Sequence, residues 1–409
     1  MQTFINMFKV LSIVIVITLT RFTTMECAKQ ENLYQNLCTS CNGFTNILHK
    51  ELSLVQTENI VSSPLSIHTI LSLLSHGAGG TTLSELTTAL RHGNLNTLSE
   101  EFKSIISLLN GIENVKLYMA NALYIQDGLQ LSEEFLSKGT DIFKSLVSHL
   151  DFKNNVDAAN KINSWVKTAT NNKITDLIES RDVGEDTKLI LLNAVYFNGN
   201  WLHRFDVKNT QQKMFHTTKT EGKLVPTMFK KASYYVGAVD SLHATFVRIP
   251  YLNEDITMII ILPNEVDGLQ TLENNFDWED LKNAPQMYNE LELYLPKFKF
   301  EATINLKSVL QKMGLNDMFE DNADFSRLTN MPLKVGKVLH KAVIEVNEQG
   351  TEAAAATVVQ MRLKRMIYTP EEFVVNRPFM FIIEHTPSKL PLFVGSVRDI
   401  KTDPVKEEL

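Results

Sequence analysis

The sequence predicts a single mixed α+β domain, and three observations support that prediction. Helical periodicity dominates the first half of the chain, whereas near-continuous apolar runs typical of buried strands fill the second half. The two kinds of segment do not alternate as βαβ units would. No repeat or low-complexity linker divides the 409 residues, whose 44% hydrophobic and 21% charged content is that of a globular protein.

The N-terminus has the pattern of a secretory signal peptide. One basic side chain, Lys9, precedes the apolar run 10–19, and Arg21 and polar residues follow it. The run is too short for a bilayer span, which needs about 20 apolar residues. We therefore expect residues 1–28 to be a signal peptide without a clear cleavage site, and the rest of the chain to have no membrane span. A buried first helix or strand is the alternative.

The three cysteines, Cys27, Cys38 and Cys41, all lie near the N-terminus. A chain that enters an oxidising compartment with a cysteine-free body is not a disulfide scaffold. Cys38 and Cys41 have the spacing of a redox motif, but no βαβ unit surrounds them. We interpret all three as incidental thiols.

Helices are expected over about residues 65–80 and 158–178. Pro64 suits the first turn of the first of these, and the glycines at 77–80 should close it rather than open a phosphate-binding helix. Strands are expected where apolar runs are bounded by turn residues or by Pro250, Pro263 and Pro296. These runs are 189–201, 244–251, 256–263, 291–300, 338–346, 373–383 and 392–397.

Signatures of catalysis are missing from the sequence. It has no phosphate-binding glycine loop, no HExxH, no Cys/His metal spacing and no Gly-x-Ser-x-Gly elbow. We therefore expect no enzyme activity, no metal and no cofactor. The formal charge of −7 argues against a nucleic-acid partner, and we expect a monomer.

The long connection between the strands at 338–346 and 373–383 is the segment most indicative of function. Connections beyond about 12–15 residues are uncommon in compact domains unless they are functional or disordered. If the first half formed a strand, one face would be small or apolar throughout and the charges would fall on the other. That first face is Thr351, Ala353, Ala355, Thr357, Val359 and Met361. Such a segment could enter a sheet with one side buried, although the alanines also favour helix.

The second half of the connection carries Arg362, Lys364 and Arg365, followed by Met366. An exposed Arg-x-Lys-Arg sequence is a substrate for proteases with acidic specificity pockets, since guanidinium groups pair with carboxylates. A solvated charge run or a simple processing site is the alternative. At the C-terminus, the tail 403–409 ends in a close variant of the Lys-Asp-Glu-Leu retrieval signal. Its four residues are Lys406, Glu407, Glu408 and Leu409.

These features come together in a resemblance to the serpin family over about residues 40–400. The matching segments are NIVSSPLSI (59–67), GAGGTT (77–82), LLNAVYFNGNW (191–201), VPTMF (225–229), RIPY (248–251), LPKFKFE (295–301), ADFSRL (323–328), VLHKAVIEVNEQGTEAAAAT (338–357), NRPFMF (376–381) and LFVGSV (392–397). The resemblance implies a fold of about nine helices around three β-sheets in one domain, residues 29–402. It also implies an exposed reactive loop at about 349–372.

Several site residues carry over from the family pattern. The hinge that permits loop insertion would be Glu348, Gly350, Thr351, Ala353, Ala354, Ala355, Ala356 and Thr357. The region where the central sheet opens would contain Ser63, Ser66, Asn193, His340 and Trp201. The implied mechanism is a suicide trap, in which the cut loop inserts as a strand before the protease can hydrolyse its acyl-enzyme.

Two registers of the reactive bond remain open. The commoner family spacing from Gly350 cuts between Lys364 and Arg365 and implies a trypsin-like target. A loop longer by one residue cuts between Arg365 and Met366, and Lys364 and Arg362 then fill further subsites, as furin-like proprotein convertases prefer. The retrieval signal favours the second register and a target in the secretory pathway, with a retrieval receptor as partner and the endoplasmic reticulum lumen as location. The alternatives are an extracellular inhibitor and a retained, non-inhibitory chaperone.

Overall fold

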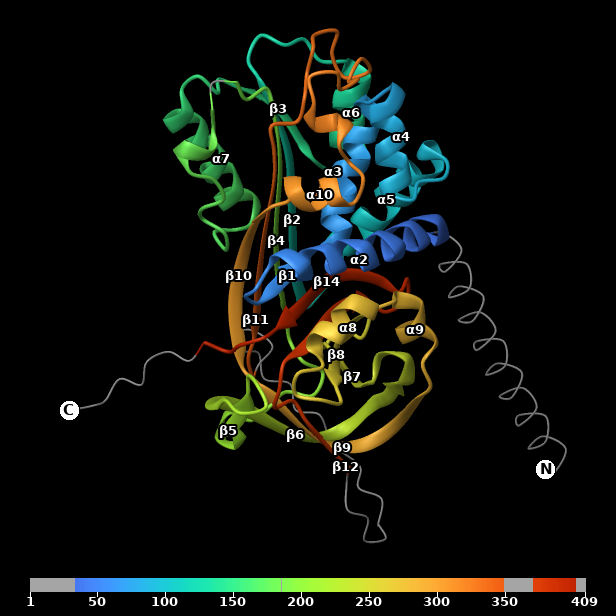
Figure 1. Ribbon diagram of the computed structural model, residues 1–409, viewed down its shortest axis with the longest axis vertical. Coiled ribbons are helices and arrows are strands. Elements are labelled where there is room, and N and C mark those ends of the chain that lie inside the picture. Colours follow the sequence, from blue (N-terminus) through green and yellow to red (C-terminus); the bar gives the residue numbers. More distant parts are fainter. Residues whose placement is uncertain (1–33, 185, 349–370, 402–409) are drawn as a thin grey trace, which may run out of the picture.

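The computed structural model describes residues 34–184, 186–348 and 371–401. Nine α-helices lie within these ranges, as the resemblance implies (Figure 1). They are α2 (Gln35–Val55), α3 (Pro64–Gly77), α4 (Gly80–Ala89), α5 (Leu95–Asn110), α6 (Glu133–Asp141), α7 (Asn155–Ala169), α8 (Leu269–Asn275), α9 (Trp278–Asn283) and α10 (Lys307–Lys312).

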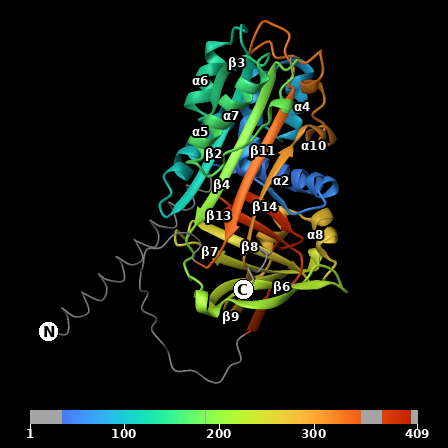
Figure 2. The same cartoon turned by 90° about the vertical axis from the view of Figure 1, so that its left-hand side faces the viewer.

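A five-stranded sheet runs the length of the upper part of the molecule, with α7 on one face and α3 on the other (Figures 1 and 2). In spatial order its strands are β10 (Phe298–Asn305), β11 (Lys337–Val346), β4 (Leu189–Gly199), β2 (Val115–Gln126) and β3 (Leu146–Leu150). Every residue of β4 is buried. A strand covered on both faces explains the uninterrupted apolar run from which it was predicted.

A nine-stranded sheet forms the lower part. Its strands are β1 (Ile60–Ser62), β14 (Leu390–Val397), β13 (Phe379–His385), β8 (Ile256–Pro263), β7 (Ala244–Pro250), β6 (Gly222–Val239), β9 (Gln286–Pro296) and β12 (Glu371–Val374), with β5 (Gln211–His216) beside β6. The 18-residue β6 pairs with β5 over residues 222–227, with β9 over 227–237 and with β7 over 235–239. It therefore joins two of the three expected sheets into one hydrogen-bonded sheet.

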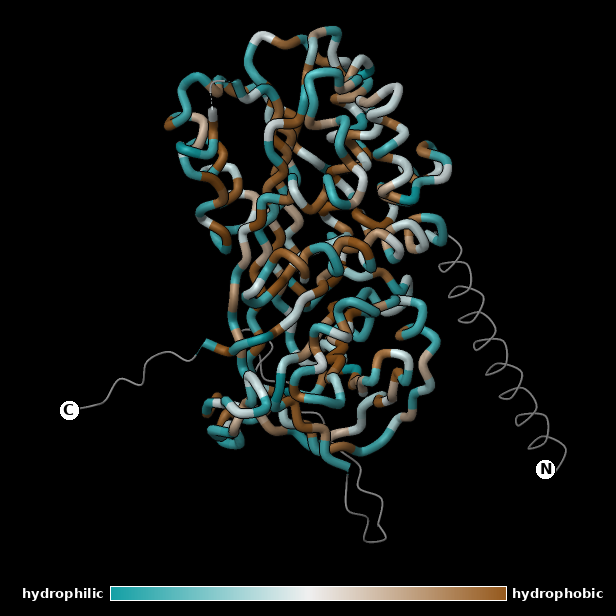
Figure 3. The backbone as a smooth tube through the Cα atoms, in the orientation of Figure 1, coloured by the Kyte–Doolittle hydropathy of each residue, from teal (hydrophilic) through white to brown (hydrophobic). Residues whose placement is uncertain are grey.

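Helix α3 is the centre of the core. Pro64 occupies its first turn, as predicted, and all of its residues except His76 are buried. A helix that is buried on all sides packs inside a domain. Apolar positions of the chain accordingly gather on α3 and on the strands, and polar positions gather at the turns and outer helices (Figure 3).

Four of the expected elements differ in the structure, three of them as follows. The helix expected over 158–178 ends at Ala169, because Asn171 and Asn172 take left-handed conformations with φ of 51° and 60°. The expected strand 373–383 is divided between β12 and β13. The glycines at 77–80 both close α3 and open α4, which begins at Gly80.

The expected strand 291–300 is also two strands, in different sheets. Pro296 ends β9, and β10 begins at Phe298. Between them the backbone N–H of Lys297 donates to the carbonyl of Pro226 at 2.8 Å. A proline cannot donate to a ladder, and the chain crosses from one sheet to the other at this point.

Candidate functional site

The candidate site is centred on two neighbouring parallel strands, β4 and β11, in the middle of the five-stranded sheet (Figure 2). They are in register from Lys337 opposite Ile190 to Ile344 opposite Phe197. The long connection begins directly after β11. A segment that reverses direction there and enters between the two strands would run antiparallel to both. It would replace one parallel ladder by two antiparallel ladders, which are the more stable kind.

A row of buried polar side chains crosses these strands at mid-length. Asn121 on β2, Asn193 on β4 and His340 on β11 occupy adjacent positions on three successive strands. Asn193 Nδ2 hydrogen-bonds to Asn121 Oδ1 and to the hydroxyl of Ser66, and His340 Nδ1 hydrogen-bonds to Asn193 Oδ1. The backbone N–H of Ser63 donates to His340 Nε2 at 3.2 Å. The first turn of α3 is thereby tied to β4 and β11.

Four of the five residues assigned to the sheet-opening region therefore lie together: Ser63, Ser66, Asn193 and His340. Asn121 completes the row and was missed. Its only sequence signal is an isolated amide in the apolar run 117–125, and nothing in that run indicates that it faces Asn193.

His340 is neutral in this arrangement. Because Nε2 accepts from a backbone N–H, the ring hydrogen sits on Nδ1 and donates to Asn193. The ring is fully buried, and burial lowers the pKa of His340 to about 3. A neutral ring held by one donor and one acceptor satisfies its hydrogen bonds only while strands β4 and β11 remain adjacent.

Trp201 does not belong to this row. Its indole N–H donates to the carbonyl of Asn347 at 2.8 Å, and its ring stacks on Tyr251 with centroids 4.3 Å apart. Trp201 therefore holds the C-terminal end of β11, where the connection begins.

Glu348 is the one residue of the predicted hinge within the described ranges, and polar groups surround its side chain. Its carboxylate accepts from Thr210 Oγ1 and pairs with Lys297 Nζ, both at 2.8 Å, and its carbonyl accepts from the N–H of Phe205 at 3.1 Å. Burial raises the pKa of this carboxyl, but the hydrogen bonds from Lys297 and Thr210 outweigh burial, and the pKa lies below its usual value.

The other loop and tail predictions lie outside the described residues. They concern Gly350, Thr351, Ala353, Ala354, Ala355, Ala356, Thr357, Arg362, Lys364, Arg365, Met366, Lys406, Glu407, Glu408 and Leu409, together with Cys27 and the signal peptide.

Cys38 and Cys41 are free thiols on α2. The Cys38 thiol donates to the carbonyl of Ser388 at 3.1 Å, and burial raises its pKa to about 12. Burial also raises the pKa of the Cys41 thiol. Thiols of raised pKa are poor nucleophiles, in keeping with their interpretation as incidental.

The part of the chain that the structure describes contains no cluster of three metal-ligating side chains. None of the helices in these ranges combines the length and apolar character required to span a bilayer.

Comparison with known proteins identifies the class of this fold and site. The family model described as "Serpin (serine protease inhibitor)" matches residues 39–400. Antitrypsin of Bombyx mori is 37% identical over 333 residues, covering 80% of this chain and 85% of the relative, and alaserpin of Manduca sexta is 36% identical, covering 90% and 95%. The crystal structure of Serpin48 of the insect Tenebrio molitor matches with a TM-score of 0.82 at 30% identity, covering 90% of this chain and 99% of that one.

The fold and these matches place the protein in the family whose model is described as serine protease inhibitor. The chain belongs to the serpin family.

Proposed function

We propose that this serpin traps a serine protease as a covalent acyl-enzyme by inserting its cut loop between β4 and β11. The observation that carries the proposal is the parallel pairing of these strands beside the start of the connection, with a polar row that can separate below them. The alternating small face of residues 351–361 supports it, because these side chains suit a buried sheet position.

The chemical step is acyl transfer. The protease serine hydroxyl attacks the carbonyl carbon of Arg365, the peptide bond to Met366 breaks, and the new amine of Met366 takes up a proton. An ester then joins Arg365 to the protease. If residues up to Arg365 insert before water attacks that ester, the protease is carried along the sheet and its active site is distorted.

Insertion would cost free energy at the polar row. Asn193 and His340 must separate, and each would leave a buried polar group without its partner. Such an unpaired group costs about 1–3 kcal/mol. Insertion replaces one parallel ladder by two antiparallel ladders, and the additional backbone hydrogen bonds stabilise the inserted state over many residues. Insertion is therefore favourable once the first pairs have formed.

The target we propose is a furin-like proprotein convertase in the secretory pathway. Arg365, Lys364 and Arg362 would fill three acidic subsites of such an enzyme together. The signal-like N-terminus and the retrieval-like tail would bring both proteins into the same compartments.

The experiment is to mix the protein with furin and separately with trypsin, and to look for complexes that survive SDS. The mass of the C-terminal fragment, taken after denaturation, gives the bond cut. A furin complex with a fragment beginning at Met366 is expected. A complex with trypsin alone, with a fragment beginning at Arg365, would refute the convertase as target but would still support the trapping mechanism. Cleavage by both enzymes without a complex would refute the trap and favour the chaperone.

The variant Arg362→Ala tests the choice of target separately from the trapping mechanism. We expect it to slow furin trapping by at least about tenfold, because one charge-assisted contact is lost, while trypsin trapping is unchanged. Lys401→Ala, an exposed lysine outside the loop, is the matched control. Equal effects of Arg362→Ala on both enzymes would contradict the convertase register.

A further inference from the structure

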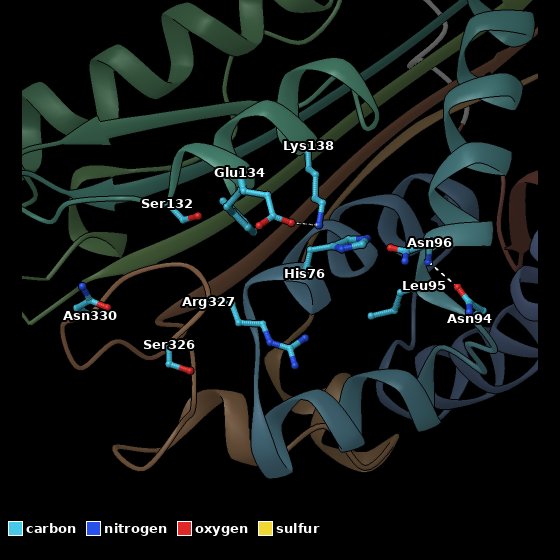
Figure 4. A pocket seen from close by; sticks show the side chains of 11 residues that line it. His76, Asn94, Leu95, Asn96, Ser132, Glu134, Lys138, Ser326, Arg327 and Asn330 are labelled. Atoms are coloured by element: carbon cyan, nitrogen blue, oxygen red, sulfur yellow. Dashed lines mark hydrogen bonds and ion pairs between the residues drawn. The ribbon is translucent and has the colours of Figure 1, made fainter.

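A polar pocket of about 790 Å3 lies where α3 ends and α5 and α6 begin. Its walls are His76 in the last turn of α3, the first residues of α5 and α6, and the segment 326–330 (Figure 4). It shares no residue with the polar row or with the start of the connection.

Two basic side chains face this pocket. Lys138 and Arg327 extend into it on either side of His76 (Figure 4). Arg327 is exposed and has no ion-pair partner within the described ranges. Lys138 Nζ pairs with Glu134 at 2.7 Å, but the Glu134 side chain is 78% exposed. The Lys138 side chain is 25% exposed, so the pair is half-buried, and another anion can compete with Glu134 from the solvent side.

The ends of two helices border the pocket. Ser132 and Asn94, the residues that precede α6 and α5, both line the pocket. The Ser132 side chain makes no capping hydrogen bond, so the first-turn N–H groups of α6 lack a side-chain partner from it. At α5 the Asn94 side chain already accepts from the N–H groups of Asn96 and Thr97, so the α6 end is the one that adds its dipole to the charges of Lys138 and Arg327, beside Glu133 and Glu134 in its first turn.

His76 lines the pocket between these two cations, with its ring hydrogen-bonded to Ser99. The Ser99 hydroxyl donates to the carbonyl of Leu95 at 2.8 Å, so at its 2.9 Å contact with His76 it accepts from Nε2–H. Nδ1 is left with its lone pair. Burial and then the charge of Lys138 lower the pKa of His76 to about 4. A bound anion would raise the pKa of His76, because its charge is opposite to that of Lys138.

We propose that this pocket binds a small phosphorylated or sulfated polyol. Lys138 and Arg327 take the anionic group, and the amides of Asn96 and Asn330 and the hydroxyl of Ser132 are placed for hydroxyl groups. The volume is ample for a monosaccharide phosphate. The lining carries two cations and one carboxylate, a net charge of +1, in a protein whose formal charge is −7.

The first test titrates the full chain with glucose 6-phosphate, inorganic phosphate and glucose, by calorimetry and by the NMR signals of His76. Saturable binding of the sugar phosphate at one site is expected, with phosphate weaker and glucose much weaker. Glucose binding as tight as glucose 6-phosphate, or no saturable binding of either anion, would overturn the proposal.

Charge variants give the second test. We expect Arg327→Gln to weaken binding about tenfold, as the loss of one charge-assisted contact does, and Glu134→Gln to tighten it. Lys167→Gln removes an exposed lysine on α7 and should change nothing. If Arg327→Gln and Lys167→Gln weaken the binding of glucose 6-phosphate equally, the affinity depends only on the net charge of the protein, and the proposal is overturned. Protease trapping is measured separately, and neither result depends on the other.

Discussion

Acidification should destabilise this protein well before its carboxylates titrate, and His49 offers a clear test. The ring lies fully buried between α2 and β14, with one hydrogen bond, from Nε2 to the hydroxyl of Ser396 at 3.2 Å. Burial and then the charge of Arg398 lower the pKa of His49 to about 3. In the unfolded chain its pKa is about 6.5. Protons therefore bind the unfolded state more strongly throughout the interval between these values.

The sign and size follow from linkage. A histidine whose folded pKa is lowered contributes its full stability above about pH 6.5 and loses about 1.4 kcal/mol for each pH unit below it. At pH 5 the loss for His49 is about 2 kcal/mol. His68 and His340 are also fully buried, with pKa values lowered by burial to about 4 and 3, and each should add a similar loss. Glu273 and Glu384, whose pKa burial raises, act in the opposite direction.

The assay is urea unfolding of the wild type and of His49→Gln at pH 7.5, 6.0 and 5.0. Whatever the variant costs at pH 7.5, its stability relative to the wild type should improve by about 2 kcal/mol at pH 5, because glutamine cannot take up the proton. His243→Asn changes an exposed histidine at a left-handed position that asparagine tolerates, and serves as the control. If His49→Gln and the wild type lose stability in parallel between pH 6.5 and 5, the reasoning is wrong.

Three further substitutions test other parts of the argument. Ala355→Arg places a charge on the face that must be buried, so we expect cleavage to continue while more inhibitor is consumed per protease trapped; unchanged stoichiometry would contradict insertion. Lys297→Met leaves the buried Glu348 carboxylate without its cation and should cost about 2 kcal/mol by urea unfolding. A second change, Glu348→Gln, should recover part of that loss, and no recovery would mean that the ion pair contributes nothing. Trp201→Phe keeps a stacked ring but removes the donor to Asn347, and we expect a loss of about 1 kcal/mol with the same assay.

Sequence patterns were sufficient where local signals agree with the fold. Pro64 marks the start of α3. The uninterrupted apolar run from residue 189 predicts β4, because a strand buried on both faces does not alternate between apolar and polar residues. The family pattern assigns Ser63, Ser66, Asn193 and His340 to one region of the sheet. The structure places them within hydrogen-bonding distance of one another.

Long-range pairing is what the sequence could not give. Asn121 is one amide in an apolar strand, and only the register of β2 on β4 places it beside Asn193. Lys297 looked like the interior of a strand, although its backbone bonds to Pro226 and its side chain pairs with Glu348. These partners are far away along the chain, and no local periodicity encodes them.

The strands that follow residue 370 determine how a cut in the preceding connection would be detected. β12 pairs with β9, and β13 lies between β8 and β14 in the interior of the nine-stranded sheet. A chain cut near residue 365 would therefore keep its C-terminal piece as a non-covalent subunit, held by buried ladders on both sides. Size-exclusion chromatography of the cut protein would show a single species of unchanged size. Only an unfolding step would reveal that it had become two polypeptides.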